Sequence, residues 1–151
     1  MAHTDGEKKL EGTVIVRGEG HGFAQTIIAG EHRYLSDEPP SAGGTDLGPS
    51  PYDLLLSALG ACTSMTMAMY ARRKQWPLDR VTIHLRHSRV HADDCVSCES
   101  GDVALTVIDR DIAIEGSLDQ AQRARLLEIA NRCPVHRTLT STTITVRTRL
   151  I

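Results

Sequence analysis

Two cysteines stand in different settings, and both could do thiol chemistry. Cys62 lies near the middle of residues 50–74, a stretch that is apolar almost all the way round a helix. Cys133 ends a second helical pattern, and His136 and Arg137, which can hold a nearby thiol as the nucleophilic thiolate, lie just beyond it. Two thiols that meet would let one attack a peroxide and the other resolve the sulfenic acid as a disulfide. The alternative for each is packing, because free cysteine is among the most buried residue types.

A second cysteine pair, Cys95 and Cys98, forms a C-x-x-C motif in a turn-rich segment. The pair could supply half of a zinc site, with His91, His87 or His84 as a nearby nitrogen ligand. His91, Cys95 and Cys98 supply three ligands, whereas a structural zinc site usually has four. A redox dithiol is a second interpretation, although the βαβ context of thioredoxin-like motifs is absent, and two loop cysteines without a function are a third.

The composition limits the class of protein. The 151 residues are typical of one domain, which we expect to span 1–151 with a loose leader in 1–10. A net charge of -2 and an aromatic content of 3% argue against nucleic-acid binding, which favours basic faces and stacking rings. The polar start of the chain shows no apolar secretion signal, so we expect a cytoplasmic protein with reduced thiols. Its four cysteines then favour catalytic, redox or metal-binding roles over a disulfide framework.

The elements that must position these residues follow from hydrophobic periodicity and from chain breakers. The apolar stretch around Cys62 holds about 17 residues, fewer than the ~20 of a membrane span, so it predicts the buried central helix of a soluble domain. Strands and helices are segregated along the chain rather than wound as βαβ units, which predicts an α+β fold. The expected elements are strands over 12–20, 23–28 and 32–35 with a hairpin turn at Gly30, a helix over 50–74, strands over 80–92 and 103–116, a helix over 117–133 and a last strand over 143–151.

Two segments carry a resemblance to a known family. Residues 44–81, with the motif GPSPY, and residues 126–139, with the motif CPVHRTL, resemble the OsmC/Ohr family of osmotically inducible protein C and organic hydroperoxide resistance proteins. The two motifs occur in the family's order, and the resemblance covers roughly residues 12–151. It implies an OsmC-like fold in which antiparallel sheets pack around a long buried central helix, in an intertwined homodimer.

The resemblance also implies a reaction. Cys62 would be the peroxidatic thiol and Cys133 the resolving thiol of a thiol-dependent peroxidase that reduces organic hydroperoxides to alcohols in oxidative-stress defence. A lipoyl or small dithiol would rereduce the disulfide, and no cofactor, nucleic acid or membrane would take part. The alternative is an OsmC-fold homodimer without efficient turnover that binds a small molecule, with a metal site at Cys95 and Cys98.

The positions that tune the thiol depart from the family pattern. The peroxidases of the family use an arginine from the N-terminal hairpin and a glutamate just after the helix proline, and these positions hold Phe23 and Tyr52 here. Asp53 is the candidate for the role of the glutamate, and Arg17 or Arg33 of the hairpin for that of the arginine. A nearby cation is needed because a buried thiol otherwise stays protonated at neutral pH.

Overall fold

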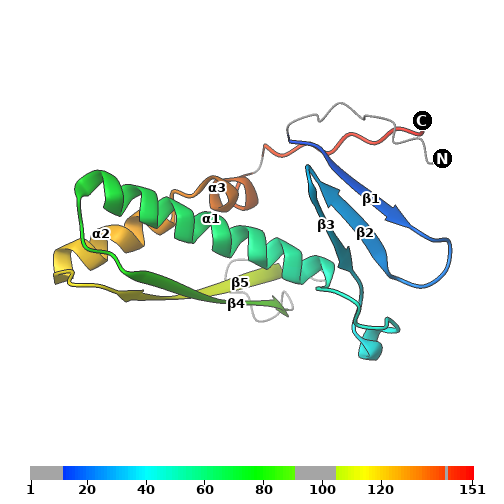
Figure 1. Ribbon diagram of the computed structural model, residues 1–151, viewed down its shortest axis with the longest axis horizontal. Coiled ribbons are helices and arrows are strands. Elements are labelled where there is room, and N and C mark those ends of the chain that lie inside the picture. Colours follow the sequence, from blue (N-terminus) through cyan, green and yellow to red (C-terminus); the bar gives the residue numbers. More distant parts are fainter. Residues whose placement is uncertain (1–11, 91–104, 142) are drawn as a thin grey trace. The chain divides into compact units, whose positions relative to one another are not determined.

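The computed structural model describes residues 12–90, 105–141 and 143–151, and the chain divides into two compact units, 1–54 and 55–151. Figure 1 shows short strands in the first unit and a long helix beside a two-stranded ribbon in the second. Both sheets are antiparallel, and the strands and helices are segregated along the chain. The expected α+β class is therefore confirmed.

The first unit contains a three-stranded antiparallel sheet in the order β1 (Val14–Gly18), β2 (Gln25–Ala29) and β3 (His32–Ser36). Gly30 lies in the turn between β2 and β3 with a φ of 63°, a conformation that glycine adopts without a steric penalty. The expected hairpin turn is thus present. The strand expected over 23–28 begins slightly later, at the start of β2.

A buried carboxylate organises the loop between β3 and the long helix. Asp37 is 2% exposed, and its Oδ2 accepts hydrogen bonds from the Thr45 hydroxyl at 2.6 Å and from the backbone N–H groups of Thr45 and Leu47 at 3.1 and 3.3 Å. Its Oδ1 accepts from the Glu38 N–H at 2.8 Å. The loop includes one turn of 3-10 helix, η1 (Pro40–Ala42), and these bonds satisfy backbone donors that a loop would otherwise leave to water.

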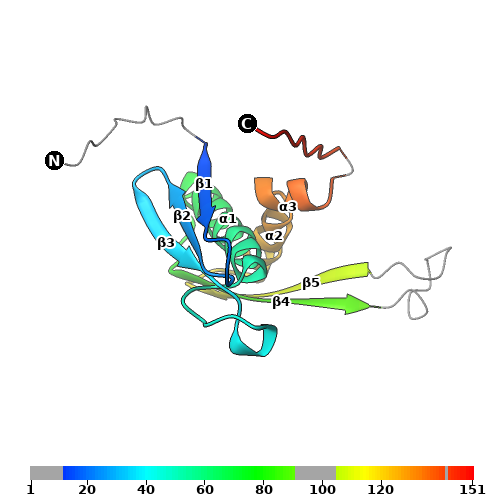
Figure 2. The same ribbon diagram turned by 90° about the vertical axis from the view of Figure 1, so that its right-hand side faces the viewer.

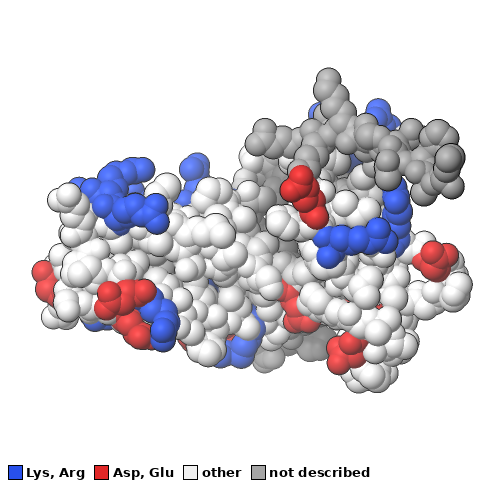
Figure 3. Space-filling model, viewed as in Figure 1, with Lys and Arg blue, Asp and Glu red and all other residues white. Residues whose placement is uncertain are grey.

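The long helix α1 (Pro51–Lys74) has defined signals at both ends. Ser50 Oγ accepts from the Asp53 N–H at 3.2 Å, while Asp53 Oδ2 accepts from the N–H and the hydroxyl of Ser50 at 2.9 and 2.7 Å. This reciprocal capping satisfies donors at the helix start. Three basic residues fill the last turn, where they complement the helix dipole, and Figure 3 shows positive charge gathered at that end.

The second unit contains a long ribbon formed by β4 (Arg80–Val90) and β5 (Leu105–Glu115), which pair antiparallel. The expected long antiparallel pair is therefore present. Figures 1 and 2 both show α1 and a shorter helix on the same side of this ribbon. Gly60 of α1 comes so close to β4 that an added Cβ would lie 2.9 Å from Leu85 Cδ1.

The helix expected over 117–133 is present as the shorter α2 (Gln120–Ala130), and a further short helix, α3 (Pro134–Leu139), begins at the proline that follows. Asp119 Oδ1 accepts from the Gln122 N–H at 2.7 Å, and Gln122 Oε1 accepts from the Asp119 N–H at 3.0 Å. This capping box sets the start of α2. Proline begins α3 because its missing N–H and fixed φ suit the first helical position.

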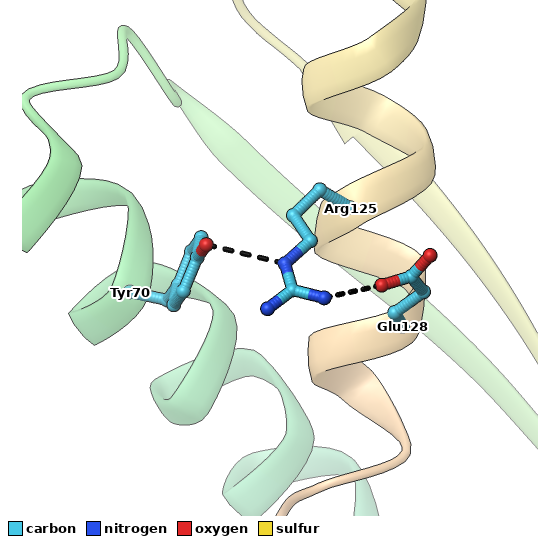
Figure 4. Close-up of polar contacts among 3 residues, drawn as sticks. All are labelled: Tyr70, Arg125 and Glu128. Carbon is cyan, nitrogen blue, oxygen red and sulfur yellow. Dashed lines mark hydrogen bonds and ion pairs between the residues drawn. The ribbon is translucent and has the colours of Figure 1, made fainter.

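The helices α1 and α2 pack against one another through buried apolar side chains. Beside this core, Tyr70 of α1 accepts a hydrogen bond from Arg125 Nε of α2 at 3.2 Å, and Arg125 forms an ion pair with Glu128 (Figure 4). The ring of Tyr70 also meets Trp76 edge to face, with 5.5 Å between ring centroids. The buried members of the core are Met67, Ala71, Leu118, Leu126 and Ala130.

A further face of α1 is exposed in the single chain. Met65 is 70% exposed and Met69 is 55% exposed. In Figure 3 the surface over the middle of α1 shows neither positive nor negative side chains. Among the residues that the structure describes, α1 is long and apolar enough to cross a membrane by length and composition, a test that the core helix of a soluble protein also passes. Only part of the helix is buried by the chain itself.

Residues 143–151 form no strand, so the last expected strand is wrong for the single chain. The alternating pattern is there, but Ile144, Val146 and Leu150 are 54%, 84% and 100% exposed. A strand needs a neighbour to pair with its backbone N–H and C=O groups, and none of the described strands pairs with this segment. The leader expected over 1–10 lies outside the described residues.

Candidate active site

Cys62 and Cys133 come from different elements and meet in the second unit. Cys62 lies in the middle of α1 and is half-buried, whereas Cys133 lies between α2 and α3 and is 0% exposed. Both are free thiols, and Cys62 lies close enough to Cys133 to contribute to the lowering of its pKa. The structure thus brings together the two thiols that the sequence singles out.

Cys133 is held by groups from two helices. As the N-cap of α3, its Sγ accepts a hydrogen bond from the His136 N–H at 3.2 Å. From α1, the fully buried Thr63 places its Oγ1 3.6 Å from the same sulfur. Thr63 Oγ1 also lies 2.7 Å from the Leu59 carbonyl, so its single hydroxyl hydrogen can serve either Leu59 or Cys133.

Arg110 brings a positive charge to this pair from β5. Its Nη1 donates to Thr63 Oγ1 at 2.8 Å and to the Ala130 carbonyl at 3.4 Å, and its Nη2 donates to Asn131 Oδ1 at 2.7 Å. The guanidinium therefore joins the ribbon to α1 and to the C-terminal end of α2, shortly before Cys133. A helix C-terminus carries partial negative charge, which favours a cation at this place.

The ionisation of Cys133 reflects these neighbours. Burial raises the pKa of Cys133 because desolvation disfavours the thiolate. Hydrogen bonds from Thr63, the His136 N–H and Cys62 lower this pKa, and the charge of Arg110 lowers it further. The lowering contributions outweigh burial, so the pKa of Cys133 lies below the ordinary value of a thiol.

A sequence model of the protein family described as OsmC-like protein matches residues 43–149, a range that includes Cys62, Cys133 and Arg110. The chain belongs to the OsmC-like protein family. No curated protein matches the sequence of this OsmC-like protein.

Solved structures share the fold of this OsmC-like protein. An OsmC-like protein of Mycoplasma pneumoniae is 22% identical with a TM-score of 0.66, and the match covers 91% of this chain and 91% of that chain. The organic hydroperoxide resistance protein OsmC of Legionella pneumophila is 19% identical with a TM-score of 0.62, covering 87% and 92%. The organic hydroperoxide resistance protein OhrB of Bacillus subtilis is 20% identical with a TM-score of 0.58, covering 86% and 90%. At these identities the likeness shows a common fold.

His136 and Arg137 were expected to help ionise Cys133 with their side chains. Burial and the charge of Arg110 lower the pKa of His136, so its imidazole is neutral at neutral pH. The backbone N–H of His136, rather than its ring, is what contacts the sulfur in this OsmC-like protein. Arg137 is exposed on α3 and lines an open cavity of about 550 Å³ together with Pro134 and neighbouring threonines.

The other expected tuning residues of this OsmC-like protein belong to the first unit. Arg17 lies on β1 and Arg33 on β3, and both are exposed. The carboxylate of Asp53 accepts hydrogen bonds from Ser50 at the start of α1. Phe23, which the resemblance places at the position of the family's hairpin arginine, is 51% exposed. The tuning roles of Arg17, Arg33 and Asp53 stay predictions.

The expected metal ligands His91, Cys95 and Cys98 lie outside the described residues, and a zinc site at this place stays a prediction. The alternative ligands His84 and His87 lie on β4 and are exposed. Within the part of the chain that the structure describes, no group of three or more His, Cys, Asp and Glu side chains could hold a metal ion.

Thr63 and Arg110 are site residues that the motifs in the sequence do not indicate. Along β5, every second residue from Ile108 to Ile114 is half-buried, and Arg110 is the charged residue among them. A charged side chain on the inward face of a strand is costly unless hydrogen-bond acceptors surround it. That break in the apolar alternation was the signal available in the sequence.

Proposed function

We propose that this OsmC-like protein is a thiol-dependent peroxidase that reduces organic hydroperoxides to alcohols through Cys62 and Cys133, in oxidative-stress defence. The observation that carries the proposal is that Cys62 and Cys133 are free thiols in one part of the second unit, where Thr63 Oγ1 lies against Cys133 and Arg110 donates to Thr63. Membership of the family supports the substrate class, as do the names of the Legionella and Bacillus structures, which concern organic hydroperoxide resistance.

The proposed reaction takes two steps at the thiol pair. The Cys62 thiolate attacks one peroxide oxygen, an S–O bond forms as the O–O bond breaks, and the leaving alkoxide takes up a proton to depart as the alcohol. Cys133 then attacks the sulfenic acid on Cys62, which forms the disulfide and releases water. A small or lipoyl dithiol returns two electrons by two thiol–disulfide exchanges and is itself oxidised to a disulfide.

Exposure and the pKa of Cys133 distinguish the roles of the two thiols. Cys62 is half-buried and Cys133 fully buried, so Cys62 is the sulfur that a peroxide reaches first. The lowered pKa of Cys133 then favours the thiolate that resolves the sulfenic acid.

We also propose that two copies of the chain form the active homodimer. The exposed side chains of Met65 and Met69 on α1 and the unpaired alternating segment 143–151 are apolar surfaces that a second copy would cover. Apolar walls around Cys62 would favour an organic hydroperoxide over hydrogen peroxide. The dimer would take its electrons from a small or lipoyl dithiol.

Direct measurement of peroxide consumption tests the proposed activity. The parent protein and Cys62→Ser are compared on a panel of organic hydroperoxides and hydrogen peroxide, with dithiothreitol or dihydrolipoamide as reductant. We expect the parent to prefer organic hydroperoxides and Cys62→Ser to fall to the background rate. Ala61→Ser adds the same hydroxyl at the neighbouring exposed position of α1 and should keep the parent rate. Equal rates in the parent and Cys62→Ser would overturn the proposal.

A small-molecule binding protein without efficient turnover is the second candidate. Phe23 and Tyr52 favour it, because they stand where the peroxidases of the family tune their thiol. In that case the parent would bind small apolar molecules but consume no peroxide with either reductant. Cys62→Ser would then leave binding unchanged.

A further inference from the structure

We propose that Arg110 is a positioning residue for the thiol pair, which fixes Thr63 Oγ1 against Cys133 Sγ and supplies the positive charge that favours a thiolate there. The inference rests on the proposed thiol chemistry. It places the guanidinium that favours the thiolate on β5. At the hairpin position where the resemblance expects an arginine, this chain has Phe23.

The guanidinium of Arg110 is held in one orientation by acceptors from two helices. Thr63 Oγ1 of α1 lies 2.8 Å from Nη1, and Asn131 Oδ1 at the end of α2 lies 2.7 Å from Nη2. The Ala130 carbonyl accepts a further bond from Nη1 at 3.4 Å. Because the guanidinium is planar and its donors point in fixed directions, these contacts leave it little freedom beside Cys133.

Thr63 links the charge to the sulfur. Its hydroxyl has one hydrogen and two lone pairs, and one lone pair accepts from Arg110 Nη1. While Cys133 is protonated, its thiol hydrogen can reach the second lone pair as Thr63 donates to the Leu59 carbonyl at 2.7 Å. Once Cys133 has lost its proton to solvent, the Thr63 hydroxyl hydrogen turns to the sulfur. The bond from Arg110 persists in both states and keeps Thr63 in place.

Two titratable or charged side chains act on the pKa of Cys133, Cys62 from α1 and Arg110 from β5, and His136 of α3 contributes through its backbone N–H. The His136 ring is itself affected by the charge of Arg110. Burial raises the pKa of Cys133 and lowers the pKa of His136, while the charge of Arg110 lowers both. A nearby cation has this effect on both kinds of group, since it favours a thiolate and disfavours an imidazolium. Among the residues that the structure describes, Arg110 is thus the cation whose charge lowers the pKa of Cys133.

Ultraviolet absorbance of the thiolate, followed against pH, tests the proposal without any peroxide. With Cys62→Ser, Cys95→Ser and Cys98→Ser combined, Cys133 is the sole thiol of a chain that has four cysteines. In this background we expect Arg110→Gln to raise the ionisation midpoint by about one pH unit, which is about tenfold less thiolate at neutral pH. Arg110→Lys keeps the charge without the planar fork and should give an intermediate midpoint.

Arg123→Gln is the matched control. Like Arg110, Arg123 is half-buried in the second unit and donates three hydrogen bonds. Losing Arg123 should lower thermal stability without moving the Cys133 midpoint, so it separates structural damage from thiol tuning. The acceptors of Arg123 are the carbonyls of Ile114, Gly116 and Leu118.

An unchanged Cys133 midpoint in Arg110→Gln would overturn the proposal, as would an equal rise in Arg123→Gln. If Arg110→Gln fails to fold, Thr63→Val is measured instead. Valine keeps the shape of the threonine side chain but lacks the hydroxyl that joins Arg110 to Cys133. An unchanged Cys133 midpoint in Thr63→Val would then overturn the proposal. Peroxide consumption by the parent separates this inference from the proposed function. If the Cys133 midpoint shifts in Arg110→Gln but the parent consumes no peroxide, the proposed peroxidase activity is overturned and the role of Arg110 stands. If the parent consumes peroxide but the midpoint is unchanged, the role of Arg110 is overturned and the peroxidase activity stands.

Discussion

Asp37 is the residue through which pH should act on the first unit. The hydrogen bond from Thr45 lowers the pKa of Asp37, burial opposes this effect, and the N–H groups of Glu38 and Leu47 lower the pKa further. A carboxyl whose pKa is lowered by folding stabilises the protein fully above the ordinary pKa of an aspartate, 3.8. That stabilisation is lost as the pH falls through the lower, folded value. We therefore expect the stability of this unit to fall in acid.

Urea unfolding of the parent and of Asp37→Asn between about pH 3 and pH 7 measures this effect. At neutral pH, Asp37→Asn should be less stable than the parent. The amide NH2 group cannot accept the hydrogen bonds that Thr45 and Leu47 donate to the carboxylate, so these donors would be left unsatisfied. The difference should shrink toward acid, where protonated Asp37 resembles the amide. Asp46→Asn, an exposed change in the same loop, should behave like the parent. A difference that stays constant over the whole range would contradict the expectation.

At the residue scale, the sequence predicts the thiols better than their surroundings. The settings of Cys62 and Cys133 indicate thiol chemistry, and the structure places the two side chains together. The contact of Arg110 with Thr63 depends on which helix and which strand become neighbours, and the periodicity of either element alone does not contain that information. The inward position of Arg110 on β5 marks it only as a charge in need of buried acceptors.

The connection from β5 into α2 depends on a glycine. Gly116 has a φ of 137°, and a Cβ at this position would lie 2.2 Å from the Pro77 carbonyl oxygen and 3.0 Å from the Asp79 nitrogen. We expect Gly116→Ala to lower the free energy of unfolding by about 1–3 kcal/mol through backbone strain, with a further loss from the contact with Pro77. Urea unfolding measures the change. Gly20→Ala is the control, because nothing lies within 4 Å of its added Cβ, and equal losses in the two variants would contradict this explanation.

At the element scale, local sequence signals predict where helices start and where the chain turns, but they predict poorly which strands pair. The helix expected over 50–74 is α1 almost to the residue, because Ser50 caps it and basic residues and a turn end it. The helix expected over 117–133 is shorter than predicted, since Asp119 and Gln122 form its cap and it ends at Ala130, and Pro134 begins a further short helix. The strand expected over 143–151 is absent because alternation describes a side-chain pattern, whereas a strand also needs a neighbour.

At the scale of the whole molecule, the single chain buries less of α1 than its composition predicts. Met65 and Met69 are largely exposed, and the alternating residues of 143–151 have no strand partner among the described residues. Burial within one chain follows from its own sequence, whereas burial between chains also depends on the surface of a second copy. The resemblance to the OsmC/Ohr family is what predicts the homodimer.

Light scattering after size-exclusion chromatography measures the assembly of the whole molecule. We expect the parent to be a dimer and Met65→Lys to shift it toward monomer, because an unpaired charge would be buried in an apolar interface. A loss of ~3 kcal/mol weakens the dimer about 100-fold. Gln120→Lys adds the same charge at an exposed polar position of α2 and should leave the dimer intact. A monomeric parent would contradict the proposed assembly, and a dimer that survives both Met65→Lys and removal of 143–151 would place its interface elsewhere, away from the apolar surfaces that a second copy is proposed to cover.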